Sequence, residues 1–232
     1  MRIGMVCEGA SDHRTATTLA SRVLGRPVET TAIDPSIDQD PGFSRWTKLD
    51  RHPQRWPRYH LNGRRGSGEP VHGQTLVARK ALLLFTGKAE AVVLMADGDR
   101  EGPARRAAME RARIESTTIP PERIVVAVPM PEREAWHLAG FEPQDEAERD
   151  RLAQLRTELG KDPRTHSHDL KHGRDEAKSN SKRILRALTE GDDDREHGCV
   201  AETPIDVLRS RGGENGLRDF LDQALSRLEA RL

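Results

Sequence analysis

The chain is poor in several residue types, and each scarcity narrows its possible roles. It has two cysteines in 232 residues, Cys7 and Cys199, and they are not at metal-ligand spacing. We expect both to be free thiols in a reducing compartment, with Cys7 packed as a small hydrophobic residue of a strand. The single tyrosine, Tyr59, lies in an irregular segment. No strand-end tyrosine is therefore expected as a covalent nucleophile.

Long apolar runs are also missing. No apolar stretch reaches about 18 residues, and the N-terminus enters a strand-like pattern without the apolar core of a signal peptide. We therefore expect a soluble, cytoplasmic protein with no membrane contact. Lys plus Arg number 38 and Asp plus Glu number 38, so the net charge gives no information on partners.

The apolar residues make up 34% of the chain and gather in short segments, which argues against disorder. Strand-like segments alternate with helix-like ones up to about residue 140. This order predicts an α/β fold with a mainly parallel, Rossmann-like sheet flanked by helices. We expect strands at residues 2–7, 27–33, 90–97 and 123–130, and helices at residues 11–25, 73–87, 102–116 and 131–140.

Helix boundary signals accompany these segments. Ser11 is a plausible N-cap and Gly25 a stop signal for the first helix, and Pro131 suits the first turn of the fourth.

The sequence pattern divides the chain at residue 140. Residues 1–140 are expected to form the α/β domain, with residues 34–72 as a long, basic, irregular insertion. Residues 141–232 are expected to form a helical extension packed on the sheet. We expect its helices at residues 145–159, 175–188 and 214–232, and its loops at residues 161–174 and 190–198.

Acidic residues follow three of the expected strands. Because functional groups of an α/β sheet cluster at the carboxyl ends of its strands, these side chains are expected to converge. Several carboxylates at one edge repel each other unless cations neutralise them, and an oxygen-rich cluster suits Mg²⁺ or Mn²⁺. The acids are Glu8 and Asp12, then Asp97 and Asp99 with Gly98 allowing a tight turn between them, then Glu132 and Glu134. An isolated Asp or Glu of this kind is more often a helix cap.

Three of these segments resemble a known family. "VCEGASD", followed about 90 residues later by "VVLMADGDREG", resembles the TOPRIM domain, the metal-binding fold shared by topoisomerases, primases and OLD-family nucleases. Glu8, Asp97 and Asp99 match its acidic positions, and the spacing of Glu8 and Asp12 is similar to the nuclease branch. "PMPEREAWHLAG" resembles a segment of a compact bacterial TOPRIM-like family. The resemblance covers residues 1–140 and, loosely, the helical tail, and it departs from the family in the Arg-rich stretch after the second strand.

The resemblance implies a metal-dependent nuclease. Glu8, Asp97 and Asp99 would hold Mg²⁺ or Mn²⁺, Glu8 would also serve as general base, and Asp12 and Glu134 would complete a second metal site. Glu134 is favoured over Glu132, which is expected to stabilise the helix dipole from the first turn. Two residues apart, these glutamates would diverge by about 200° on a regular helix.

The resemblance to OLD-like proteins also suggests a separate ATPase partner and a role in phage defence or DNA maintenance. The chain itself lacks the second glycine and the Lys-Ser/Thr of a phosphate-binding loop. A homo-oligomer is a further expectation.

A basic segment is the second functional signal. Residues 45–65 contain seven Lys or Arg and one acid, with Trp46, Trp56 and Tyr59 between them. Basic groups neutralise phosphates and aromatic faces stack on bases, so we expect contact with nucleic acid, DNA ahead of RNA. Alternatively, this is a solvated loop that its aromatic residues hold on the core. The expected phosphate contacts are Arg51, Arg55, Arg58, Arg64, Arg65 and, in another loop, Lys171.

Histidines are clustered at residues 166–172, but the segment lacks the wider spacing of a zinc site and is read as a surface loop. Two other functions stay open. One is a non-catalytic TOPRIM-fold binding or regulatory subunit, and the other is a metal-dependent phosphatase or phosphotransferase. The intact set of acids favours catalysis, and the basic, aromatic-rich segment favours a polymeric substrate.

Overall fold

The structure, a computed structural model, describes residues 1–38, 40–49, 73–171 and 177–229. Contacts divide the chain into two compact units. Unit 1 comprises Met1–Ala96, Pro103–Ala127 and Gln223–Leu232, and unit 2 comprises Asp97–Gly102 and Val128–Asp222. The boundary expected at residue 140 follows the sequence pattern, whereas the contacts group residues 128–140 with the helical residues that come after them.

Unit 1 is built on a parallel sheet, which confirms the predicted α/β fold. The strands run in the order β2-β1-β4-β5, and the short β3 pairs with the carboxyl-terminal end of β1. All the pairings are parallel. The bounds are β1 Arg2–Cys7, β2 Glu29–Thr31, β3 Ser44–Arg45, β4 Ala91–Met95 and β5 Ile124–Ala127.

The central strands are buried almost throughout. All five residues of β4 and all four of β5 are buried, as expected for parallel strands covered on both faces. Cys7 is fully buried in β1, which confirms its predicted packing role.

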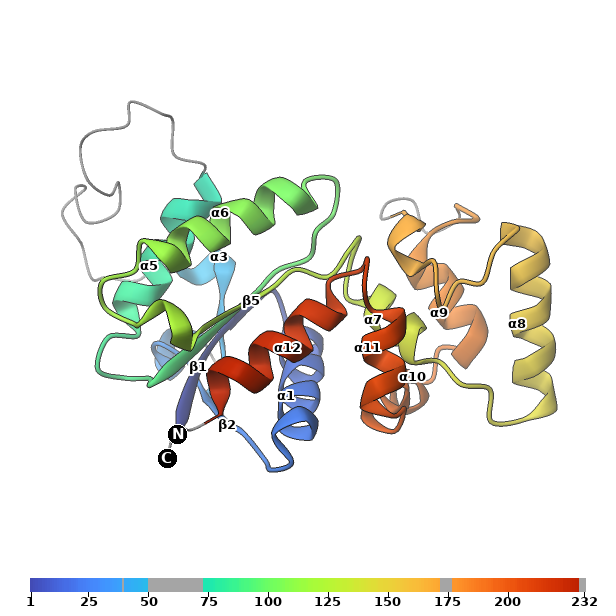
Figure 1. The fold of residues 1–232 in the computed structure, drawn as a ribbon, viewed down its shortest axis with the longest axis horizontal. Coiled ribbons are helices and arrows are strands. Elements are labelled where there is room, and N and C mark those ends of the chain that lie inside the picture. Colours follow the sequence, from blue (N-terminus) through green and yellow to red (C-terminus); the bar gives the residue numbers. More distant parts are fainter. Residues whose placement is uncertain (39, 50–72, 172–176, 230–232) are drawn as a thin grey trace. The chain divides into compact units, whose positions relative to one another are not determined.

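Helices cover both faces of this sheet (Figure 1). In unit 1, α1 (Ala10–Leu24) lies on one side and α5 (Gly73–Leu84) and α6 (Gly102–Ile114) lie on the other. Gly4 of β1 permits a close approach on the second side, because a Cβ atom there would lie 2.7 Å from the ring of Phe85.

The start of α1 differs from the prediction. The helix begins at Ala10 with Gly9 as its N-cap, so Ser11 lies inside the first turn. The carboxylate of Asp12 replaces a serine cap, since its Oδ2 accepts the backbone N–H groups of Glu8 (3.2 Å) and Gly9 (3.0 Å). The predicted stop is confirmed, because Gly25 is the C-cap with φ of +63°.

The segment expected to be irregular contains short regular elements where the structure describes it. These are α2 (Pro35–Asp38), β3 and α3 (Trp46–Leu49). Asp38 holds this segment together, because its carboxylate accepts the Ser44 hydroxyl at 2.6 Å and the Arg45 backbone N–H at 3.3 Å. Tertiary contacts of this kind leave no periodic signal in so short a stretch.

The C-terminal helix protects the outer edge of β5. The side-chain oxygen of Gln223 accepts the backbone N–H of Val126 at 3.0 Å, and its amide nitrogen donates to the Val126 carbonyl at 3.4 Å. Arg227 donates to the carbonyls of Pro121 and Ile124. An edge strand whose backbone groups are used in this way has fewer free N–H and C=O groups for pairing with a strand of another chain.

Unit 2 is helical, and its other helices pack around one buried helix, α7. All seven residues of α7 are buried, and this helix contacts α9, α10 and α11. Trp136 of α7 is fully buried, stacks on Phe220 at 5.2 Å and donates its indole N–H to the Asn215 carbonyl. It is therefore a core residue, as predicted. The bounds are α7 Glu134–Gly140, α8 Glu146–Leu159, α9 Ser181–Thr189, α10 Asp193–Ala201 and α11 Ile205–Arg211. The last helix, α12 (Leu217–Leu228), begins in unit 2 and belongs to unit 1 from Gln223 onward.

Two boundaries in unit 2 correct the predictions. Residues 190–198 were expected to be a loop, but α10 starts at Asp193, because Asp192 caps it by accepting the N–H groups of Asp194 and Arg195. The helix expected from residue 175 is seen from Ser181, where Asn180 caps α9 by accepting the Arg183 N–H. No helix among the described residues combines the length and the apolar character needed to cross a bilayer.

Candidate functional site

The carboxyl ends of β1, β4 and β5 lie at one edge of the sheet, because the three strands are parallel and in register. Glu8 follows β1 directly, and its half-exposed carboxylate pairs with Arg105 of α6 at 3.4 Å. Asp12 is 8% exposed and caps α1 as described above. These two acids belong to unit 1, whereas Asp97 and Asp99 belong to unit 2. A cation shared between the two pairs stays a prediction.

The Asp97-Gly98-Asp99 stretch is fixed by backbone contacts. Gly98 N–H donates to the Pro129 carbonyl at 2.8 Å, and Asp99 N–H donates to the Pro131 carbonyl at 2.7 Å. A Cβ atom on Gly98 would lie 2.5 Å from Met130 Sδ, so a larger residue cannot occupy this position without displacement. Asp99 adopts φ of +48°, a left-handed conformation that Asp tolerates better than most residues.

The side chain of Asp97 is also held by a hydrogen bond to the backbone. One of its oxygens accepts the backbone N–H of Arg133 at 2.9 Å, just before α7. The segment after β4 is thereby joined to the start of α7, which carries the next acids.

Lys182 of α9 pairs with Glu132 and lines the same cavity as Glu134. Glu132 is 3% exposed and binds the Lys182 ammonium at 3.1 Å, and its other oxygen accepts the Ser181 hydroxyl. Burial opposes protonation of Lys182, but the carboxylates of Glu134, Glu132 and Asp97 outweigh it and raise its pKa. Three acids of unit 2 therefore act electrostatically on Lys182, of which Glu132 is in direct contact with it.

This arrangement corrects the reading of Glu132. It was expected in the first turn of a helix with Pro131, stabilising the helix dipole. The helix begins at Glu134 with Arg133 as its N-cap, so Glu132 precedes it and is buried between Ser181 and Lys182. The divergence expected on a regular helix does not apply to these two glutamates.

Glu134 is 7% exposed, and its two oxygens differ. Oε1 accepts a hydrogen bond from the Arg133 guanidinium at 2.9 Å. Oε2 is buried and has no hydrogen-bond partner among the residues that the structure describes. Because a buried, unpaired carboxylate oxygen is costly, it points to a donor or cation that binds there.

A cavity of about 390 Å³ opens beside Glu134. Its described lining residues are mostly charged and come from α7, α9, α10 and the turn before α10. They are Arg133, Glu134, Lys182, Arg186, Gly191, Asp193 and Glu196.

Buried polar contacts hold two of these residues in position. His137 Nδ1–H donates to the Glu196 carbonyl at 2.8 Å, and Arg133 donates to His137 Nε2 at 3.1 Å, which fixes the neutral tautomer. Burial raises the pKa of the Glu196 carboxyl, opposed by Arg133 and reinforced by Glu134.

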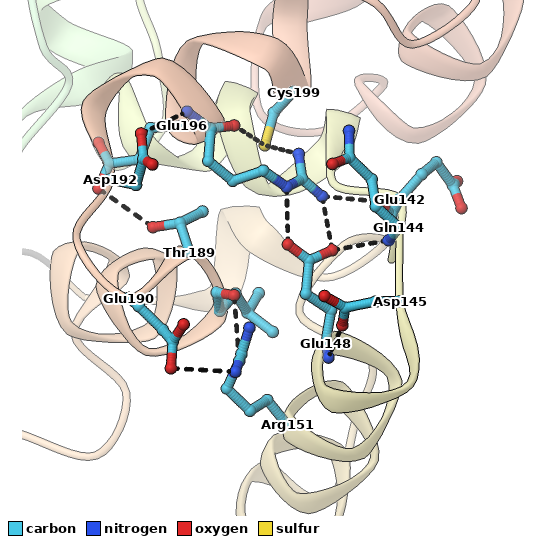
Figure 2. A network of polar contacts seen from close by, with 12 residues as sticks. Glu142, Gln144, Asp145, Glu148, Arg151, Thr189, Glu190, Asp192, Glu196 and Cys199 are labelled. Atoms are coloured by element: carbon cyan, nitrogen blue, oxygen red, sulfur yellow. Dashed lines mark hydrogen bonds and ion pairs between the residues drawn. The ribbon is translucent and has the colours of Figure 1, made fainter.

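A second polar network fixes the α10 wall of this cavity (Figure 2). Arg195 of α10 binds Glu148 of α8 through two hydrogen bonds of 2.7 and 2.8 Å, and Glu148 also accepts the Gln144 N–H at 2.7 Å. Arg195 further donates to the Glu142 carbonyl at 2.7 Å and lies 4.8 Å from the ring centroid of Phe141. Asp193 and Glu196 are carried by the helix that this network anchors.

The described residues include only part of the basic segment. Trp46 donates its indole N–H to the Met95 carbonyl at 2.6 Å, which agrees with the alternative that aromatic residues hold this segment on the core. Lys171 forms a backbone bridge with Asn180. The predicted contacts Arg51, Arg55, Arg58, Arg64 and Arg65, with Trp56 and Tyr59, lie outside the described residues.

Sequence reasoning missed the cationic half of the site. Lys182 and Arg186 lie four residues apart in "SKRILRAL", where the sequence shows an ordinary amphipathic helix with a polar face. No sequence signal near Lys182 indicates that it forms an ion pair with Glu132, which is 50 positions earlier in the chain.

Among the described residues, no group of three or more His, Cys, Asp or Glu side chains is arranged as a metal site. Comparison of the chain with protein-family models, curated proteins and solved structures found no match.

Proposed function

We propose that this protein is a Mg²⁺- or Mn²⁺-dependent nuclease that hydrolyses phosphodiester bonds. The observation that supports this most is the set of acids in unit 2. Asp97, Glu132 and Glu134 act together on Lys182, and Glu134 retains a buried oxygen with no partner among the described residues. Such a site is built to bind positive charge next to a cavity.

The residues present suit a divalent cation in part. Glu132 is engaged by Ser181 and Lys182, so Asp97 and Glu134 are the acids of the cluster that would hold the ion, with Asp99 beside them. The TOPRIM resemblance further implies Glu8 and Asp12 as metal ligands. A bound divalent cation would offset the charge on the phosphoryl oxygens and lower the pKa of a water molecule. Lys182 would bind a non-bridging oxygen, and Glu8 would accept the proton of the attacking water.

The biological setting follows the resemblance. We propose DNA as the first substrate to test, cytoplasmic action in phage defence or DNA maintenance, and a separate ATPase partner. Self-association of the chain is part of the same proposal.

A metal-dependent phosphatase or phosphotransferase is the second candidate. It is favoured by the cavity, whose described lining carries charged side chains and no aromatic side chain for a base to stack on. A non-catalytic TOPRIM-fold subunit is the third reading, in which the ion pairs of Glu132 and Glu134 serve stability alone.

The test is cleavage by the purified full chain. Plasmid, linear DNA, RNA and a small phosphate monoester are each incubated with Mg²⁺, Mn²⁺ or EDTA. We expect cleavage of nucleic acid that EDTA abolishes and that Asp97→Asn or Asp99→Asn reduces at least a hundredfold, as for loss of a main electrostatic group. Asp206→Asn is the matched control, because Asp206 has a 97% exposed side chain and lies on another helix.

Hydrolysis of the monoester alone would select the phosphatase. The proposed site would be contradicted if the unmodified chain cleaved none of these substrates. It would also be contradicted if the Asp97 and Asp99 variants were as active as the unmodified chain.

The basic segment has its own test. Replacing Arg51, Arg55 and Arg58 with Ala should reduce the slope of log binding constant against log salt by roughly 0.9 per lost contact on duplex DNA. An unchanged slope would return the segment to a structural role.

A further inference from the structure

The cavity beside Glu134 presents charges of both signs on different walls. Lys182 and Arg186 are four residues apart on α9 and therefore project from the same face of that helix. Glu134 comes from α7, and Asp193 and Glu196 come from α10. With Arg133, the described lining holds three cationic and three acidic side chains, whose formal charges cancel.

This balance of charges disfavours a ligand that carries only positive or only negative charge. A free anion would meet Lys182 and Arg186 but also the carboxylates of α7 and α10. A free divalent cation would meet Glu134 but also the two cations of α9. Like charges brought together in a partly buried site repel strongly, so the best ligand presents a positive and a negative centre together.

The two walls also have unused binding capacity. The buried Glu134 Oε2 has no hydrogen-bond partner within the described part of the chain. The Lys182 ammonium has three N–H donors and one 3.1 Å contact with Glu132, and the Arg186 side chain is exposed. Guanidinium and ammonium groups are the usual partners of phosphate oxygens.

We propose that this cavity binds a phosphate group and a divalent cation as a coupled pair, with the cation on Glu134 and the phosphate against Lys182 and Arg186. The choice of phosphate rests on the proposed function. Because the described lining has no aromatic side chain on which a base could stack, the proposed cavity binds the phosphate without recognising the base.

Coupled binding is measurable without catalysis. The full chain is titrated with Mn²⁺, whose electron paramagnetic resonance signal falls on binding, with thymidine 5′-phosphate, thymidine or no addition present. We expect thymidine 5′-phosphate to tighten Mn²⁺ binding about tenfold and Mn²⁺ to tighten nucleotide binding equally, since such coupling is reciprocal. Thymidine, which lacks the phosphate, should have no effect.

Variants then assign the two walls. Arg186→Gln should reduce the coupling to less than about twofold, on the scale of typical couplings, whereas Mn²⁺ affinity without nucleotide should not fall, because one repelling cation is removed. Arg183→Gln is the matched control on the same helix, because Arg183 pairs with Glu158 at 3.1 Å and is not among the lining residues. Glu134→Gln should weaken Mn²⁺ binding itself, and circular dichroism checks that each variant is folded.

Three results would overturn the inference. They are nucleotide binding that is independent of Mn²⁺, coupling that survives Arg186→Gln, and Mn²⁺ binding that is unaffected by Glu134→Gln. The outcome is separable from the nuclease test. Coupled binding without cleavage would support the proposed ligand pair and refute the nuclease. Cleavage without coupled binding would support the nuclease and refute the proposed ligand pair.

Discussion

The ion pair between Arg195 and Glu148 should be worth far more than a surface pair, and Arg195→Met tests this. Glu148 is 5% exposed, and the side chain of Arg195 is 13% exposed. Methionine keeps the apolar stem beside Phe141 but removes the guanidinium. Glu148 would then retain the Gln144 N–H as its remaining donor from this network (Figure 2).

Removing one partner of a buried ion pair costs about 3–5 kcal/mol, because the other charge is left buried. Residual exposure at Arg195 favours the lower end, about 3 kcal/mol. For a chain of this size, that corresponds to a loss of about 6–12 °C in Tm. In the double variant Arg195→Met/Glu148→Gln no buried charge is left unpaired, so it should recover about 1–2 kcal/mol of the loss.

Urea denaturation followed by circular dichroism measures these differences. Glu190→Gln is the control, because the Glu190 side chain is 74% exposed and its pair with Arg151 should contribute less than about 1 kcal/mol. A loss below about 1 kcal/mol for Arg195→Met, within the range of surface pairs, would refute the reasoning. A double variant no more stable than the single one would refute it equally.

Three further predictions concern the acids and the sheet edge. Glu132→Gln should lower the free energy of unfolding by about 1–3 kcal/mol in denaturant titrations, because it weakens buried charge-assisted contacts on both oxygens. Glu134→Gln should cost less, because it weakens one such contact, with Arg133, and should reduce cleavage more. Hydrogen bonds from neighbouring arginines outweigh burial and lower the pKa of Asp162 from 3.8 to about 2. Its contribution is present above pH 4 and lost as pH falls toward 2, so Asp162→Asn should flatten the stability profile in that window. Gln223→Ala should cost about 1–3 kcal/mol by unpairing the Val126 backbone, and unchanged amide exchange there would contradict this.

The sheet was predictable because its signals are local. Apolar runs such as "AVVLM" specify buried strands, and helices between them require parallel pairing. The helix stop at Gly25 was predictable for the same reason, since a left-handed C-cap needs only the residue itself. The start of α1 was not, because Asp12 caps it from inside the first turn and Ser11 imitates the usual signal.

The acids of unit 2 could be found from the sequence, but their partners could not. Asp97 is marked by the strand before it. Glu132 and Glu134 are marked by the start of a helix, although their burial and their common cation are not. The pairing with Lys182 depends on how α9 packs on α7, which is a tertiary property. Arg186 joins the site for the same reason, and an amphipathic pattern shows its face but not what that face meets.

The contrast between Glu132 and Glu134 separates the structural part of the cluster from the part available for binding. Both are almost fully buried, yet within the part of the chain that the structure describes Glu132 has a partner on each oxygen and Glu134 on one. An unpaired buried oxygen costs about 1–3 kcal/mol, which folding alone gives no reason to retain. Costs of this size persist at sites where a ligand recovers them. Glu132 therefore fixes Lys182 in position, and Glu134 is the acid to which we assign the proposed cation.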